Sequence, residues 1–407
     1  MHDIQRFPAG ALVLLAAGLF VASTSEFLPV ALLSTIAEDL GVGVGAVGQL
    51  VTVFAISLVV FSIPLASATR FLPPKLVLLG SMAGIACSAI LSGSAPDFTV
   101  LLIARVIGGA MHALCAATTV AMMSSIVRKE HMGRAVAITT AGGTLTFILG
   151  IPGSAALGDL LGWRAAFLLS AASLLAVAAV LARLLPAIGP SVDGDSRPAA
   201  PSSRVGWTWW LRDPELQVLF AVSLLAVTSM AGHFALYTYV NPWMTRALGI
   251  ADHSLPIVLF IFGAASGLGL LIATPLADLA PRRVFVACAA LVGVAVGALA
   301  MVPASTVVVV LAIAVWGFAQ GGIPGILQAK LMRTASPRNR HLAGALQAMG
   351  GNVGVALGSV VGALVAGWQG IAALPWLLVS CYVAILLVVV VDGATSARRG
   401  PAAESPG

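Results

Sequence analysis

The sequence predicts an all-α integral membrane protein with twelve transmembrane helices in two six-helix halves. Three observations predict it: the composition, the apolar runs, and one polar segment in the middle of the chain. The 407 residues are 59% hydrophobic and only 9% charged, whereas a soluble domain carries about a quarter charged residues. With a mean hydropathy of +1.05, the chain has too much apolar surface for water, so we expect lipid as its solvent.

Twelve apolar runs are long enough to span a bilayer, since a spanning helix needs about 20 predominantly apolar residues. The expected spans are residues 9–34, 46–69, 76–95, 98–125, 134–158, 164–186, 216–241, 255–279, 284–302, 306–328, 342–367 and 371–391. The first run continues past any signal-peptide length without a cleavage motif. We therefore expect an uncleaved first helix.

One long connection divides the spans into two sets of six. It is rich in Pro, Ser, Gly and charge, a composition typical of linkers. Pro64-Leu65-Ala66 in the second span and Pro275-Leu276-Ala277 in the eighth occupy matching positions, which favours two related halves. The expected organisation is an N-terminal six-helix bundle at 1–186, a cytoplasmic linker at 187–213, a C-terminal six-helix bundle at 214–393 and a flexible cytoplasmic tail at 394–407.

The positions of the basic residues predict the orientation. If the N-terminus is inside, all but three of the 21 Lys and Arg residues fall in inner segments, and the exceptions are Arg105, Arg164 and Arg246. An excess of Lys and Arg marks the cytoplasmic loops of membrane proteins. We therefore expect both termini and the linker to be cytoplasmic and the protein to lie in a bacterial inner membrane.

Several motifs carry a resemblance to a known family. The first span contains Thr24-Ser25-Glu26-Phe27-Leu28-Pro29, the fourth Arg105-Val106-Ile107-Gly108-Gly109, and the fifth Gly150-Ile151-Pro152-Gly153 followed by Gly158. Together they resemble the major facilitator superfamily, in particular its bacterial proton-antiporter branch of drug, sugar and nucleoside exporters. The resemblance implies the major facilitator fold, whose pseudo-symmetric bundles alternate access to a central cavity, and it makes Gly150, Pro152 and Gly158 part of the antiporter motif.

Two departures from the family pattern affect the expected gating residues. Gly153 stands where the family has a larger residue, and the loop after the second span lacks the family's aspartate. The matching loop of the second half keeps Asp278, Arg282 and Arg283. The resemblance therefore assigns the gating charges to the second half.

Glu26 is the sharpest chemical feature, because an ionised carboxylate near the bilayer midplane is costly unless it is paired or hydrated. Protonation near neutral pH would remove that cost, so we expect Glu26 to couple transport to protons. Arg105, the one basic residue inside a span, is expected to modulate the proton affinity of Glu26. The alternatives are a structural carboxyl held by hydroxyls such as that of Thr24, and an arginine that reaches for the outer interface.

Further polar residues in the spans are candidate cavity residues. They are His112, His233, Tyr237, Asn241, Trp316, Gln320, Gln347 and Asn352. Histidines and uncharged amides suit hydroxylated or heterocyclic ligands, although each side chain could instead make a hydrogen bond between helices or pack in the core. Short stretches around His112, His233 and Tyr237 also look like those of arabinose-type sugar exporters and purine-nucleoside exporters.

Small residues at four-residue spacing predict close helix packing. Gly354 and Gly358 form such a face in the eleventh span, and Gly158 belongs to one in the fifth. We expect these two helices to pack against each other and to let the halves rock.

The sequence shows no phosphate-binding loop, no metal-ligand cluster and no nucleophile motif. We therefore expect no cofactor, no metal, no catalytic residues and no enzymatic activity. The expected partners are a small-molecule substrate, protons and membrane lipids, without nucleic acid, for a monomer. The leading hypothesis is proton antiport of amphiphilic drugs or related solutes; sugar or purine-nucleoside efflux is the alternative, and a membrane receptor or enzyme is the hypothesis of another class.

Overall fold

The computed structural model describes residues 8–186, 213–301, 305–336 and 339–398, and in those ranges every regular element is helical. Twelve helices are long and apolar enough to cross a membrane, which confirms the expected number. The spans of the first half are α1 Ala9–Ala31, α3 Val44–Thr69, α4 Pro74–Gly93, α5 Phe98–Ile126, α6 Met132–Leu145 with its continuation, and α8 Trp163–Leu184. Those of the second half are α9 Pro214–Tyr237, α11 Leu255–Leu279, α12 Pro281–Met301, α13 Thr306–Thr334, α14 Arg340–Gln369 and α15 Leu374–Arg398.

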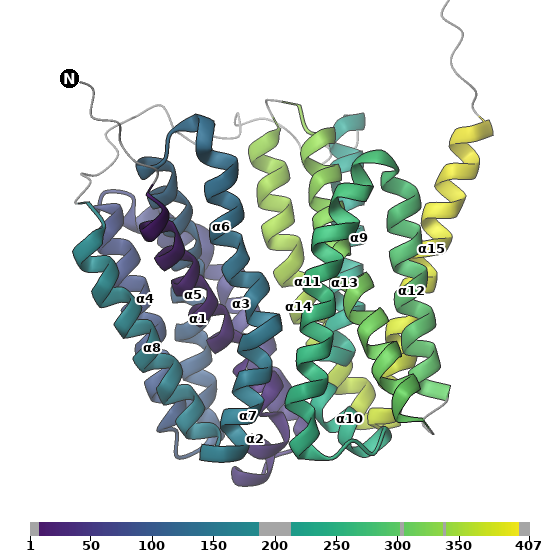
Figure 1. The fold of residues 1–407 in the computed structure, drawn as a ribbon, viewed down its shortest axis with the longest axis horizontal. Coiled ribbons are helices and arrows are strands. Elements are labelled where there is room, and N and C mark those ends of the chain that lie inside the picture. The colour runs from purple at the N-terminus through teal and green to yellow at the C-terminus, as the bar shows by residue number, and fades with distance from the viewer. Residues whose placement is uncertain (1–7, 187–212, 302–304, 337–338, 399–407) are drawn as a thin grey trace, which may run out of the picture.

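The helices form two bundles that lie side by side (Figure 1), one made of α1 to α8 and the other of α9 to α15. The expected linker lies outside the described residues except for Asp213, and so does the tail beyond Arg398. Helix α15 continues to Arg398, past the boundary expected at residue 393. We call the face at which α1 begins and α15 ends the linker face, and the other the opposite face.

The first helix of each half breaks at the opposite face and is followed by a short helix. Helix α1 ends at Ala31 and α2 runs Leu33–Asp39, while α9 ends at Tyr237 and α10 runs Val240–Ala247. The sequence predicted one continuous span in each place. Pro29 removes a backbone donor just before the first break, and Pro242 sits at the start of α10. The matching breaks are consistent with two related halves.

The fifth span is irregular at its centre. Helix α6 passes into a π-helix at Thr146–Gly150 and then into α7 Ile151–Leu161. Pro152 is the second residue after the π-helix, and such bulges appear where a proline or an inserted group disturbs the helical ladder. Gly150 and Gly158 lie against Thr24 and Leu32 of the first span, where any larger side chain would overlap them. The predicted motif residues therefore act here by allowing the fifth span to approach the first.

The two halves contact each other toward the opposite face. Gly48 of α3 lies against the Tyr239 side chain, and a Cβ at Gly45 would lie 3.9 Å from Ala363 of α14. Gly263 and Gly267 of α11 lie against Phe147 and Ile148 of the π-helix. In α3, every buried residue falls between Val47 and Ser57, so its linker-face half is not covered by the second bundle.

The expected packing of the fifth span on the eleventh is wrong. Gly354 and Gly358 lie against Met230 and Ala231 of α9, within the second half. The fifth span meets α11 instead, through the contacts of Phe147 and Ile148. The four-residue spacing correctly indicated a close helix contact, but small-residue spacing contains no information about which helix is the partner.

Candidate functional site

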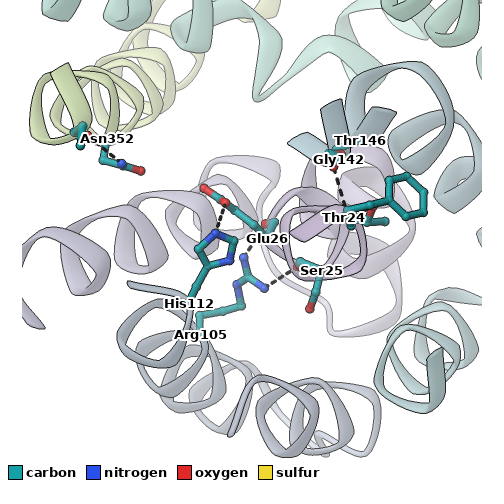
Figure 2. A network of polar contacts seen from close by, with 10 residues as sticks. Thr24, Ser25, Glu26, Arg105, His112, Gly142, Thr146 and Asn352 are labelled. Carbon is teal, nitrogen blue, oxygen red and sulfur yellow. Dashed lines mark hydrogen bonds and ion pairs between the residues drawn. The ribbon is translucent and has the colours of Figure 1, made fainter. Parts of the chain in front are cut away.

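Glu26 and His112 form a buried polar pair in the first half (Figure 2). The Glu26 carboxylate lies on α1, 3.7 Å from Nε2 of His112 on α5, and each residue is 7% exposed. Gly108 and Gly109 of α5 lie against Ser88 of α4 and the backbone of Phe54 of α3, so α5 packs closely on both helices. The sequence predicted both residues as functional, but it placed His112 at a substrate cavity rather than on Glu26.

Arg105 binds the backbone of α1 and not the Glu26 side chain. Its guanidinium donates to the carbonyl oxygen of Ser25 at 2.8 Å and to that of Glu26, and it lies 4.3 Å from the centre of the Phe54 ring. Pro29 explains the first bond: it has no N–H, so the carbonyl four residues earlier, that of Ser25, loses its helical partner. Arg105, which is 1% exposed, therefore pairs with the carbonyl that the kink at Pro29 leaves free, next to Glu26. Its expected influence on Glu26 stays a prediction.

A cavity of about 340 Å³ lies between the halves. The fifth span contributes Thr140, Gly143, Thr144 and Phe147, and α9, α11 and α13 contribute the rest of its wall. Of the predicted cavity residues, His233 and Gln320 line it. The wall contains no Asp, Glu, Lys or Arg, and its size suits a small organic molecule.

An aromatic cluster surrounds the buried end of this cavity. The His233 ring stacks on Tyr237 at 4.8 Å and on Phe262 at 6.0 Å between centroids, and Trp316 meets its edge at 5.6 Å. Tyr237 and Trp316 are buried behind the wall, so they support the cavity residues and do not line the cavity. Phe147 of the first half approaches Tyr237 at 6.1 Å.

The remaining predicted cavity residues lie elsewhere. Asn241 donates across the halves to the carbonyl of Ala31 at 3.0 Å, which makes it a contact of the opposite face. Asn352 (Figure 2) donates to Ala348 one turn earlier in its own helix at 3.0 Å, and it does not line the cavity. Gln347 is also absent from the wall, and its buried Oε1 has no hydrogen-bond partner among the described residues. These three residues do not line this cavity, and their contact with substrate stays a prediction.

The second-half residues that the resemblance assigns to gating make short-range contacts at the linker face. Asp278 pairs with Arg333 of α13, and both side chains are more than half exposed. Arg282 donates to the carbonyl of Val389 on α15 at 2.7 Å. Arg283 is exposed. These contacts tie α11, α12, α13 and α15 together within one half.

A charged cluster also joins helix ends at the opposite face. The Asp39 carboxylate, just after the first break, accepts hydrogen bonds from Arg164 and from Nε1 of Trp163 at 3.2 Å. The hydrogen bond from Arg164, followed by that from Trp163, holds the pKa of the Asp39 carboxyl below its ordinary value. Arg164 also donates to the carbonyl of Ala95 at 3.2 Å, so the cluster holds three connections of the first half together.

Sequence reasoning missed several residues of the site. Phe147, Phe234 and Phe262 give the cavity most of its ring surface, and Tyr382 holds Gln320, as described below. Phenylalanines in a membrane helix carry no signal of their own, because lipid-facing and cavity-facing rings look alike in the sequence. Tyr382 was detectable in principle, since a hydroxyl in a span needs a partner.

Nothing in the described part of the chain suggests a metal centre, because no group of three or more His, Cys, Asp or Glu side chains gathers there. Cys87, Cys115, Cys288 and Cys381 are free thiols. A twelve-span bundle with a cavity between two halves and a buried carboxylate in one of them is typical of membrane transport proteins.

Comparison with known proteins identifies the family. The family model described as Major Facilitator Superfamily matches residues 15–242 and 222–406. A chloramphenicol resistance protein of Streptomyces lividans is 31% identical over 88% of this chain and 89% of its own length. A probable sugar efflux transporter of Mannheimia succiniciproducens is 28% identical over 88% of both chains.

The fold matches solved transporters as well. The crystal structure of a bacterial homolog of the human lysosomal transporter Spinster, inward-facing and occupied, superposes with a TM-score of 0.73 at 16% identity, covering 97% of this chain and 96% of that one. The protein belongs to the Major Facilitator Superfamily. It is a multi-pass membrane transporter with relatives in efflux, not an enzyme.

Proposed function

We propose that the protein exports small organic solutes, amphiphilic drugs or related compounds, across a bacterial inner membrane by proton antiport with alternating access. The observation that carries the proposal is Glu26, a carboxyl buried beside the imidazole of His112 while the neighbouring cation, Arg105, donates to backbone carbonyls. A carboxyl so placed is costly when ionised and can be relieved by a proton. Its protonation state can therefore differ between two conformations of the transporter.

The geometry gives Glu26 and His112 distinct roles in this proposal. At 3.7 Å the carboxylate and Nε2 lie close enough for one proton to pass between them after a small movement. Arg105, held by the kink, keeps a positive field near the carboxyl without closing it in an ion pair. Proton binding then changes the charge of the helix that ends at Ala31, where Asn241 of the second half is attached.

Alternating access requires the contacts of one face to open while those of the other close. The contacts of Asn241 with Ala31, of Tyr239 with Gly48 and of Phe147 with Gly263 close the opposite face here. The cavity lies on the linker-face side of Phe147, with Thr140, Thr144 and Pro324 in its wall. We assign this arrangement to the state that takes up substrate from the linker face.

The basic side chains support a cytoplasmic linker face. Arg70, Lys75, Arg128, Arg183, Arg282, Arg283, Lys330 and Arg333 lie at helix ends on that face, while Arg164 and Arg246 lie near the opposite one. Because cytoplasmic segments are enriched in Lys and Arg, substrate would enter the cavity from the cytoplasm and leave outward.

The relatives favour two substrate classes. One is named for chloramphenicol resistance and others for sugar efflux. Drug-like compounds are the first candidate because most of the cavity wall is apolar or aromatic. Sugar or purine-nucleoside efflux is the second candidate, favoured by the names of the sugar efflux relatives and by His233 and Gln320 in the wall.

Transport by purified protein in liposomes tests the proposal. With an acidic interior, wild-type protein should accumulate radiolabelled chloramphenicol, L-arabinose or inosine against its gradient. Glu26→Gln should abolish accumulation but keep exchange of substrate for substrate, because exchange needs no net proton movement. Glu38→Gln, an exposed carboxyl just past the first break, is the matched control and should behave as wild type.

Two results would count against it. Substrate accumulation that does not depend on the pH gradient would contradict proton antiport. Normal gradient-driven accumulation by Glu26→Gln would show that Glu26 is not the coupling site.

A further inference from the structure

Four buried polar atoms on α9 and α13 lack hydrogen-bond partners among the described residues. They are Nδ1 of His233, Oη of Tyr237, Nε1 of Trp316 and Nε2 of Gln320. The four residues are at most 5% exposed, and they form two pairs with four-residue spacing, one on α9 and one on α13. Native proteins leave few buried polar groups unpaired, because each costs about 1–3 kcal/mol. Two of the four residues, His233 and Gln320, line the cavity, and their unpaired atoms point to a ligand that supplies the missing partners.

A hydrogen-bonded chain behind the cavity orients Gln320. The Tyr382 hydroxyl on α15 donates to Oε1 of Gln320 at 2.6 Å, and it lies 2.8 Å from the hydroxyl of Ser229 on α9. Since the Gln320 oxygen is taken, its two amide N–H groups are what the side chain can offer elsewhere. Gln320 lines the cavity, so it presents donors to whatever occupies it.

His233 supplies the second polar contact and a flat surface. Its ring is nearly parallel to that of Phe262, at an interplanar angle of 10°, and is 3% exposed. A neutral imidazole has one donor and one acceptor nitrogen, so it can meet a hydroxyl in either sense. Phe147, Phe234 and Phe262 add further ring surface to the cavity wall.

The charge of the cavity is equally informative. None of its lining residues is Asp, Glu, Lys or Arg, and Glu26 is absent from its wall. A permanent cation in this cavity would have no counter-ion in the wall and would lose its hydration shell, which is costly. A sugar without a flat ring would leave most of the aromatic wall without a matching surface.

We infer that the cavity binds uncharged molecules that combine a flat aromatic or heteroaromatic ring with acceptor oxygens or nitrogens. The ring packs among His233, Phe262 and Phe147, an acceptor takes the Gln320 amide N–H, and a hydroxyl meets His233. The inference rests on the proposed function and narrows its substrate class. It places neutral aromatic drugs and purine nucleosides inside the class, and lipophilic cations and pentoses outside it.

Equilibrium binding to purified protein in detergent, without a membrane or a gradient, tests the inference. The probes are chloramphenicol and inosine, which are neutral and carry a ring with several acceptors, and two compounds outside the class. Tetraphenylphosphonium is a cation without acceptor oxygens or nitrogens, and L-arabinose has no aromatic ring. Calorimetry should show binding of at least one ring compound, and the other two probes should bind at least tenfold more weakly. Gln320→Leu should weaken binding of the ring compound about tenfold, the loss expected for one hydrogen bond.

Two variants separate contact from folding. Gln328→Leu changes an exposed glutamine two turns further along the same helix and should bind as wild type. Tyr382→Phe keeps the ring but frees the Gln320 amide to rotate, so it should weaken binding by a smaller factor than Gln320→Leu and leave thermal stability within a few degrees.

The outcomes separate this inference from the proposed function. Tighter binding of tetraphenylphosphonium or arabinose than of both ring compounds, no binding of either ring compound, or ring binding indifferent to Gln320→Leu would overturn it. Ring binding without gradient-driven transport would leave the inference intact and contradict only proton antiport. Gradient-driven transport of arabinose alone would contradict the inference and leave proton antiport intact.

Discussion

The bond between Arg105 and the carbonyl that Pro29 leaves free makes a quantitative prediction. Arg105→Met removes every donor from that site while keeping a long side chain. The Ser25 and Glu26 carbonyls then lose this partner, and an unpaired buried carbonyl costs about 1–3 kcal/mol. Pro29→Ala restores an N–H that can reach Ser25, so it should recover about 1–3 kcal/mol in the Arg105→Met background beyond its effect in wild type.

Unfolding in mixed detergent and SDS micelles, followed by circular dichroism, measures the four corners of this double-mutant cycle. The coupling free energy isolates the Ser25 carbonyl, because effects of either change alone cancel. Arg183→Met on α8 is the control, since Arg183 lies near the linker face while Pro29 lies near the opposite one, and it should combine additively with Pro29→Ala. Additivity of Arg105→Met and Pro29→Ala within about 0.5 kcal/mol would refute the reasoning.

Three further predictions concern the two faces. The pKa of the Asp39 carboxyl is lowered in the folded protein. Its stabilising effect is therefore present above the unfolded pKa of about 3.9 and is lost as the pH falls through the lower folded pKa. The difference in melting temperature between wild type and Asp39→Asn should be constant near neutral pH and shrink below about pH 4. A Cβ at Gly263 would overlap the Phe147 carbonyl, so Gly263→Ala should separate the two halves. In a background without native cysteines, this change should speed maleimide labelling of Asn241→Cys about tenfold. Gly293→Ala is the control and should leave the labelling rate unchanged, because a Cβ at Gly293 meets no atom within 4 Å. Because Asp278 and Arg333 are both largely exposed, Asp278→Asn should lower stability by less than about 1 kcal/mol in SDS unfolding, and a larger loss would show that the pair is more than a surface contact.

The sequence predicted the fold well because the bilayer imposes a simple rule. Each span must satisfy its own backbone and present about 20 apolar residues, so the number of spans follows from hydropathy. The breaks at Leu32 and Thr238 were missed, because they depend on how Pro29 and the Asn241 contact are accommodated between helices. Helix partners were also out of reach, as the glycine face of α14 showed by packing on α9.

The residues of the candidate site could be chosen from the sequence, but their arrangement could not. Glu26, Arg105, His112, His233 and Gln320 were recognisable because charged and strongly polar side chains within a membrane are rare and need partners. Which partners they find depends on helix rotation and depth, neither of which periodicity resolves in helices that are apolar on all sides. Arg105 on backbone carbonyls and Asn241 at the interface between halves are the results of that packing.

Substrate-induced proton release measures the central claim, that binding of substrate and of a proton at Glu26 are linked. Chloramphenicol or inosine is added to purified protein in weakly buffered detergent near neutral pH, and the pH change is followed with an indicator dye. Wild type and Glu38→Gln should release protons when the compound is added. Glu26→Gln should release none, although that variant still binds the compound. Binding without release in wild type, or unchanged release in Glu26→Gln, would contradict it.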